Sequence, residues 1–145
     1  MTAYDADNVF AKILRGEIPA ARIYEDDDVL AFMDVMPQGD GHALVIPKTP
    51  SRNLLDADPA TVATLFTAAQ KIARAARAAF NADGVFIGQF NEAAAGQTVY
   101  HLHVHILPRF DGVEPNRHAS GSFADPQVLA EHAGRIRAEL DKDAG

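Results

Sequence analysis

Cysteine is absent from the 145-residue sequence, and long apolar runs are missing as well. Without cysteine, disulfides, thiol nucleophiles and cysteine-held zinc or iron–sulfur centres are excluded. No apolar run approaches the roughly 20 residues that a membrane-spanning helix needs. Residues 1–5 also lack the basic and then apolar pattern of a secretory signal. We therefore expect a cytoplasmic protein that does not associate with membranes.

Basic side chains are the minority among the charged residues: 13 stand against 20 acidic ones, which gives a formal net charge of −7. An acidic surface disfavours non-specific binding to nucleic acid and to anionic membranes, so neither is expected as a partner. Hydrophobic residues make up 48% of the chain, which argues against wide disorder. No period of about 20–50 residues recurs, which excludes solenoids and propellers.

Hydrophobic periodicity and turn residues predict a mixed α+β fold. Helices are expected over residues 5–16, from Pro59 to Phe80 and over residues 128–140. In the first, an early aspartate can cap the start and Gly16 can end the helix. The second follows a candidate cap at Asp58. Strands are expected over residues 22–25, 29–34, 42–46, 85–90 and 100–107.

About five strands with mostly tight connections favour an antiparallel sheet that carries one long helix and one or two shorter ones. The length suits one domain over residues 1–145. We place its core at about residues 5–110. The tail, at about 111–145, is irregular at first and ends in a helix.

The most informative segment holds three histidines at alternate positions, His101, His103 and His105. Successive side chains of a strand point to opposite faces, so these imidazoles share one face while the apolar residues between them share the other. Three imidazoles suit a hydrophobic core poorly. A surface strand would normally use β-branched or aromatic residues instead.

Strand geometry limits what this row of histidines can do. Alternate residues lie roughly 6.6 Å apart, so the outer two are about 13 Å apart. A metal holds imidazole nitrogens at about 2.0–2.1 Å, so all three cannot bind one ion, although two neighbours and an outside ligand could. A purely structural row is another alternative. The favoured interpretation is an active-site floor, where one imidazole attacks while the others hold charge or donate hydrogen bonds.

A loop rich in small residues, 91–98, precedes the histidines. Its backbone N–H groups and the side chains of Gln97 and Thr98 can approach an anion closely. By itself such a loop is more often an ordinary surface loop. Beside three histidines it becomes a candidate phosphate-binding loop.

Residues 101–107, His-Leu-His-Val-His-Ile-Leu, resemble the signature of the histidine-triad (HIT) family, in which three histidines alternate with apolar residues. The likeness extends to residues 9–19, which resemble the family's N-terminal segment, and to residues 34–48, which resemble its central block. Residues 91–100 are similar to its phosphate loop. Together these segments cover about residues 5–110 in the family's order, and the Hint-like or general bacterial branch is the most similar.

The resemblance implies a homodimeric nucleotide hydrolase or transferase that acts at an α-phosphorus through a nucleotidyl-histidine. Its implied substrates are purine nucleotides, either nucleoside phosphoramidates or dinucleoside polyphosphates. His103 would be the nucleophile, and His101 would orient it through its backbone carbonyl. His105 would contact phosphate oxygens, and His42 would lie near the leaving group.

The same resemblance assigns nucleotide contacts to residues outside the triad. Asp34 would hold the ribose hydroxyls, and Asn91, Gln97 and Thr98 would contact the phosphate and the leaving group. The apolar base pocket would be formed by Val9, Phe10, Ile13, Ile18, Phe32, Val35 and Leu44.

Two features depart from the family pattern. The zinc-binding cysteines of many bacterial relatives are replaced here by Asn8 and Ala11, and a further histidine ligand by Pro50. We therefore predict no structural zinc and no cofactor. The phosphate loop is one residue shorter than in Hint proteins, which leaves the role of Asn91 open.

Alternatives to an enzyme of this kind remain at the level of the sequence. The chain could be a nucleotide-binding or protein-interaction module with little catalysis, or a metallohydrolase that uses two triad residues. Asp34 could serve only as a turn residue, and His42 as a hydrogen-bonded histidine at a strand start. Arg109 could reach a phosphate or be a plain surface charge.

Overall fold

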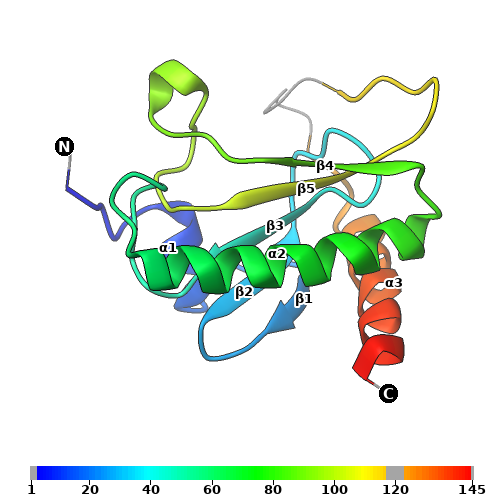
Figure 1. Cartoon of the computed structure of the whole chain (residues 1–145), viewed down its shortest axis with the longest axis horizontal. Coiled ribbons are helices and arrows are strands. Elements are labelled where there is room, and N and C mark those ends of the chain that lie inside the picture. Colours follow the sequence, from blue (N-terminus) through cyan, green and yellow to red (C-terminus); the bar gives the residue numbers. More distant parts are fainter. Residues whose placement is uncertain (1–2, 117–122, 145) are drawn as a thin grey trace.

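A five-stranded sheet and three helices make up the computed structural model, which describes residues 3–116 and 123–144 (Figure 1). The elements follow one another as α1 (Val9–Leu14), β1 (Arg22–Glu25), β2 (Val29–Met33), β3 (Ala43–Pro47), α2 (Pro59–Phe80), β4 (Gly84–Gly88), the 3₁₀ turn η1 (Ala93–Ala95), β5 (Val104–Arg109) and α3 (Pro126–Ala144). Within the described residues, no helix is long and apolar enough to cross a membrane.

The strands lie in the order β1-β2-β3-β5-β4, and each neighbouring pair is antiparallel. The predicted α+β fold with a five-stranded antiparallel sheet is therefore confirmed. β3 is the central strand and is buried along its whole length. Its register with β5 places Leu44 opposite His105, which brings the last triad histidine to the middle of the sheet.

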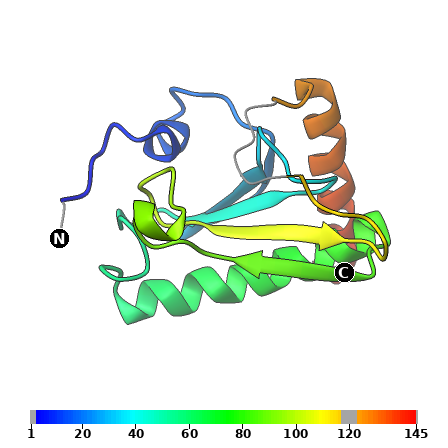
Figure 2. The same cartoon turned by 90° about the horizontal axis from the view of Figure 1, so that it is seen from above.

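The two faces of the sheet bury different sets of side chains. Val45, Val104 and Ile106 point to the face that α2 and α3 cover, where the larger hydrophobic core lies. Leu44, Phe32 and other alternate residues point to the opposite face and pack against Phe10 and Ile13 of α1. Figure 2 shows α2 along one face and the short α1 on the other. A six-residue helix covers only part of that second face, which leaves room for a site.

The helix limits differ from the prediction in ways that capping explains. α1 begins at Val9 because the side chain of Asn8 accepts the N–H of Ala11 at 2.9 Å, so an asparagine and not an early aspartate caps it. The predicted end at Gly16 is confirmed, since this residue has φ +78°. α3 is longer than the predicted 128–140.

The strand that carries the histidines also differs from the prediction. β5 starts at Val104, not at residue 100, because the chain before it turns away from β3 and Leu102 donates its N–H to the carbonyl of Ser51 at 2.9 Å. The strand also runs past its predicted end at residue 107 and includes Pro108. β3 pairs only with residues 104–106 of β5, so the missing N–H of Pro108 falls beyond that ladder, and the strand continues to Arg109 against β4.

Candidate active site

Four histidines, His42, His101, His103 and His105, lie close together, and one of them, His103, packs against Phe10 of α1. All four are at most 5% exposed. The predicted alternation holds although residues 101–103 precede β5, because Leu102, Val104 and Ile106 all lie in the core on the other face. The ring of His103 lies 5.0 Å from that of His105 and 4.9 Å from that of Phe10, measured between centroids.

The backbone carbonyl of His101 determines the tautomer of His103. Nδ1 of His103 lies 2.6 Å from that oxygen. A carbonyl oxygen can only accept, so Nδ1 carries the proton and Nε2 of the neutral ring carries the lone pair. Nε2 is therefore the nitrogen of neutral His103 that carries the lone pair.

The ring of His101 is held in place by two hydrogen bonds. Its Nε2 donates to the carbonyl of Pro47 at 2.8 Å, and its Nδ1 accepts the hydroxyl of Tyr4 at 2.6 Å. Burial lowers the pKa of His101, so the ring is neutral in this arrangement. This fixes the peptide whose carbonyl accepts the hydrogen bond from Nδ1–H of His103.

His42 and His105 form a second chain of hydrogen bonds with a defined direction. The N–H of Gln38 donates to Nδ1 of His42 at 3.0 Å, so a neutral His42 carries its proton on Nε2. That Nε2 lies 3.0 Å from Nδ1 of His105 and donates to it. His105 in turn carries its proton on Nε2. It therefore presents an N–H donor beside the lone pair of His103.

Asp34 follows the last residue of β2 and lies against His42. The N–H of Asp34 donates to the carbonyl of His42 at 3.0 Å, and Oδ1 accepts the N–H of Met36 at 2.9 Å. Its Oδ2 lies 3.5 Å from Nε2 of His42. Burial raises the pKa of the Asp34 carboxyl to about 6, and the hydrogen bond from Met36 only partly opposes this.

Asp34, His42 and His105 also form a set of metal-type donors. One ligand atom of each lies within 4.8 Å of the others, and two imidazoles with one carboxylate suit zinc or iron. Among the described residues this set contains only one triad histidine. The metallohydrolase alternative, which required two triad members, therefore does not match the arrangement found.

An apolar slot of about 280 Å³ opens beside His103 and His105. All seven residues predicted to form the base pocket line it, together with Asp34 and Thr98. Sequence reasoning missed five further lining residues, namely Pro19, Ala20, Met36, Val99 and Phe123. The first four lie within, or directly next to, segments whose sequence resembles that of the HIT family. Phe123 instead lies in the tail, to which no function was assigned. His42 and His101 do not line the slot but are hydrogen-bonded to the lining residues His105 and His103.

Gln97 and Asn91, two of the predicted phosphate contacts, lie outside the lining of the slot. Gln97 is 4% exposed, and its Oε1 accepts the N–H of Glu92 at 2.8 Å while its Nε2 donates to the carbonyls of Arg52 and Val99 at 2.8 and 3.0 Å. Oδ1 of Asn91 accepts the N–H of Leu54 at 2.9 Å. In the described part of the chain neither residue lines the slot, so both shape the loop instead.

A bidentate ion pair, which the sequence did not reveal, holds the same loop. Nε and Nη2 of Arg52 lie 2.8 and 2.9 Å from the two carboxylate oxygens of Glu92. This pairing lowers the pKa of Glu92 to about 2. The guanidinium also lies 4.1 Å from the ring centroid of Tyr100. Glu92 has φ +74°, an unfavourable conformation for a residue with a side chain, so the ion pair stabilises a strained turn that precedes Thr98.

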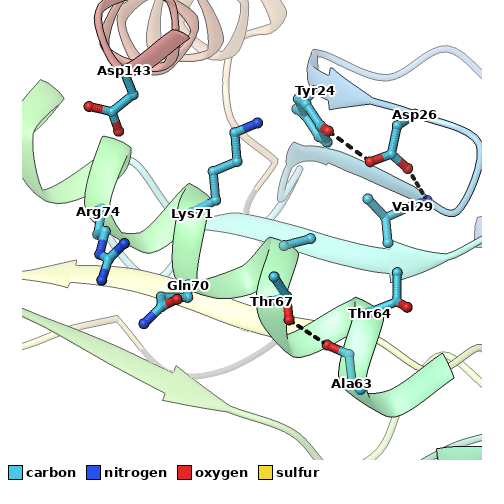
Figure 3. A pocket seen from close by; sticks show the side chains of 11 residues that line it. Tyr24, Asp26, Val29, Ala63, Thr64, Thr67, Gln70, Lys71, Arg74 and Asp143 are labelled. Atoms are coloured by element: carbon cyan, nitrogen blue, oxygen red, sulfur yellow. Dashed lines mark hydrogen bonds between the residues drawn. The ribbon is translucent and has the colours of Figure 1, made fainter. Parts of the chain in front are cut away.

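A second hollow, of about 600 Å³, lies on the opposite face between α2, the β1–β2 turn and the end of α3 (Figure 3). Lys71 and Arg74 line it together with Asp26 and Asp143, so its charges are mixed. Nζ of Lys71 lies 4.4 Å from the ring centroid of Tyr24. Its described lining contains no histidine, and we assign the chemistry to the slot. Arg109 lies outside the slot as well and donates to the carbonyl of Val113 at 3.1 Å.

Comparisons with known proteins agree with this geometry. The model of the HIT domain matches residues 15–112. An uncharacterised HIT-like protein of Mycobacterium tuberculosis is 46% identical over 104 residues, which are 72% of each chain. The adenylylsulfatase HINT3 of Arabidopsis thaliana is 41% identical over 71% of this chain and 52% of its own length. The crystal structure of a HIT-like protein of Bartonella henselae superposes with a TM-score of 0.89 at 56% identity, covering 94% of this chain and 99% of the other.

The raised pKa of Asp34 predicts that this carboxylate destabilises the fold at neutral and alkaline pH. A shift from 3.8 to about 6 corresponds to about 3 kcal/mol once both folded and unfolded states are ionised. Asp34→Asn should therefore raise the free energy of unfolding by up to that amount at pH 8. The gain should shrink as the pH falls through 6 and vanish below about pH 4, where the acid is protonated in both states.

Urea denaturation at intervals between pH 4 and 8 measures this difference. Asp27→Asn, at an exposed position of the β1–β2 turn, is the matched control and should show no comparable gain. If Asp34→Asn lowers the free energy of unfolding at pH 8, and by as much as it does at pH 4, the explanation is wrong.

Proposed function

Because the chain belongs to the HIT family, we propose that it hydrolyses or transfers nucleotidyl groups at an α-phosphorus, with His103 as the nucleophile. One observation carries the proposal. The hydrogen bond to the His101 carbonyl leaves the lone pair of His103 on Nε2, beside an apolar slot and next to the N–H of His105. A nucleophile, a hydrogen-bond donor for an anionic phosphate and a pocket for a flat apolar group together suit attack on a nucleotide.

The proposed substrate is a purine nucleotide whose base enters the slot among Phe10, Phe32 and Leu44. Asp34 lies on the same lining and would accept hydrogen bonds from the ribose hydroxyls. Nε2–H of His105 and the hydroxyl of Thr98 would then donate to the oxygens of the α-phosphate. These donors oppose the negative charge that builds on those oxygens during transfer.

In the proposed first step, Nε2 of His103 forms a bond to phosphorus while the bond from phosphorus to the leaving group breaks. The leaving group takes the electron pair, and an amine leaving group departs protonated, with a proton taken up from solvent. The imidazole then carries a positive charge, because Nδ1 keeps its proton, and the carbonyl of His101 stabilises that charge. In the second step water attacks phosphorus and releases one proton to solvent, the N–P bond breaks, and the ring regains its lone pair.

His42 has a different proposed role from contact with the leaving group. It does not line the slot, and its donor bond to His105 fixes the tautomer that directs a proton at the phosphate. We therefore treat His42 as a positioning residue. This residue-based chemistry requires no metal, and the absence of a cofactor stays a prediction.

The leaving group is the part of the substrate that the slot does not define. Nucleoside phosphoramidates and dinucleoside polyphosphates share the adenylyl group and differ beyond the α-phosphorus. The related HINT3 is named an adenylylsulfatase. The relative supports the reaction class and leaves the choice of substrate to profiling across these compounds.

Labelled adenylyl phosphoramidate distinguishes catalysis from binding alone. When the reaction is quenched in base, the protein should retain the labelled adenylyl group. Acid should then release this label, because a phosphoramidate on histidine is acid-labile. His103→Ala should abolish that label and lower kcat on the order of 10³-fold or more. His132 of α3 packs its ring on Phe80, away from the slot. His132→Ala is the matched control and should keep both label and activity.

The same experiment tests the alternatives. Reversible nucleotide binding without a labelled protein would support a binding module and overturn the enzyme proposal. Activity that is lost in EDTA and restored by zinc or iron would support a metal site at Asp34, His42 and His105 instead. The proposed reaction predicts full activity in EDTA.

We also propose that the chain forms a homodimer, with the β4 edge in the interface. β4 ends the sheet and leaves Phe86 and Ile87 48% and 44% exposed. An exposed apolar edge strand is a ready surface for pairing with another strand. Light scattering should give about twice the chain mass of 15.6 kDa, and Ile87→Arg should give single chains. A monomeric wild-type protein would contradict this proposal.

A further inference from the structure

Phe123 reaches the slot from a part of the chain that carries no other feature of the proposed site. It lies between β5 and α3, outside residues 15–112 that match the HIT domain. Its side chain lines the slot, yet Phe123 is 76% exposed, the highest exposure among the large apolar residues described. An exposed aromatic ring at the mouth of an apolar slot is a candidate contact for a ligand bound there.

Backbone hydrogen bonds fix the segments on both sides of residues 117–122 to the loop that follows Asp34. Ala124 donates its N–H to the carbonyl of Val35 at 2.9 Å, directly next to Phe123. Asn116 donates its N–H to the carbonyl of Gln38 at 2.7 Å, and Nε2 of Gln38 donates back to the carbonyl of Asn116 at 3.0 Å. Phe123 is thus attached to the same loop as the carboxylate proposed to hold the ribose.

The slot is apolar at both its floor and its mouth. Phe10 and Phe32 form the floor, where their rings meet edge to face at 5.3 Å between centroids. Val9, Val35 and Phe123 stand at the mouth and are 39%, 46% and 76% exposed. A flat apolar group bound in the slot would remove part of this rim from water, which is favourable in proportion to the area covered.

We propose that Phe123 stacks on the base of the bound nucleotide and is a specificity-determining residue that favours purines. This inference rests on the proposed function and adds to it a contact outside the HIT domain match. Aromatic rings stack on bases through their faces, and a purine offers a larger face than a pyrimidine. Phe123 takes no part in the chemical step, since its contact is with the base and not with phosphorus.

Removing the ring should weaken binding without slowing chemistry. In Phe123→Ala the dissociation constant for AMP should rise roughly 5- to 100-fold, as measured for other base–aromatic stacks. The constant for ribose 5-phosphate, obtained by competition, should not change because that ligand has no base. KM for adenylyl phosphoramidate should rise in parallel with the AMP constant, while kcat at saturation stays the same. Val113→Ala, 57% exposed in the same segment and outside the slot, is the matched control.

A fluorescent variant reports the contact directly, because the chain contains no tryptophan. Phe123→Trp introduces a single indole, whose emission should be quenched by AMP and not by ribose 5-phosphate. Val113→Trp should respond to neither. This measurement does not depend on turnover and also shows that the variant binds.

The outcomes separate this inference from the proposed function. A wild-type protein that does not bind AMP contradicts the proposed function itself. A wild-type protein that binds AMP, with an unchanged constant in Phe123→Ala and an unresponsive indole at 123, overturns only the stacking proposal. Equal weakening of AMP and ribose 5-phosphate in Phe123→Ala would also overturn it, because the ring would then shape the pocket without contacting the base.

Discussion

The 2.6 Å hydrogen bond from Nδ1 of His103 to the backbone carbonyl of His101 determines which imidazole nitrogen can attack. Imidazole has two nearly equivalent tautomers in water, and only one of them offers a lone pair on Nε2. A backbone oxygen is a dependable partner for this selection because it has no proton to lose and cannot rotate away. His101 is itself fixed by Pro47 and Tyr4. The tautomer of His103 therefore depends on the position of the peptide that contains the His101 carbonyl.

The rest of the site is arranged before a ligand binds. Gln38 fixes the direction of the His42–His105 chain, and Arg52 and Gln97 hold the strained turn at Glu92. Such preorganisation means that little rearrangement is needed when charge develops on a phosphate. It also has an energetic cost, since the buried carboxyl of Asp34 is held where ionisation is unfavourable. Stability given up at a carboxylate that faces a slot is typical of a functional residue.

Much of the fold and the slot could be predicted from local sequence patterns. Alternation gave the facing of His103 and His105 correctly because it follows from extended backbone geometry, which persists even where residues 101–103 leave the ladder. Seven of the residues that line the slot were named through a resemblance that spans many positions. The limits of β5 were wrong because they depend on where its partner β3 stops pairing, which no residue of β5 encodes.

Long-range contacts account for the features of the site that the sequence did not reveal. Gln97 looked like a phosphate ligand, but its partner Arg52 lies 45 positions away and directs its amide inward. The pair of Arg52 and Glu92 joins residues 40 positions apart and left no local signal. Phe123 carried none either, since a lone aromatic residue in a loop predicts nothing until the tail is seen to dock beside Val35.

The tautomer of His103 is the most direct test of this account. Long-range proton–nitrogen NMR of the free protein, labelled with ¹⁵N in its histidines, distinguishes a protonated from an unprotonated nitrogen in each ring. At pH values where the ring is neutral, we expect His103 to carry its proton on Nδ1, while His42, His101 and His105 carry theirs on Nε2. A proton on Nε2 of neutral His103 would contradict the account, because the proposed nucleophile would then have no lone pair facing the slot.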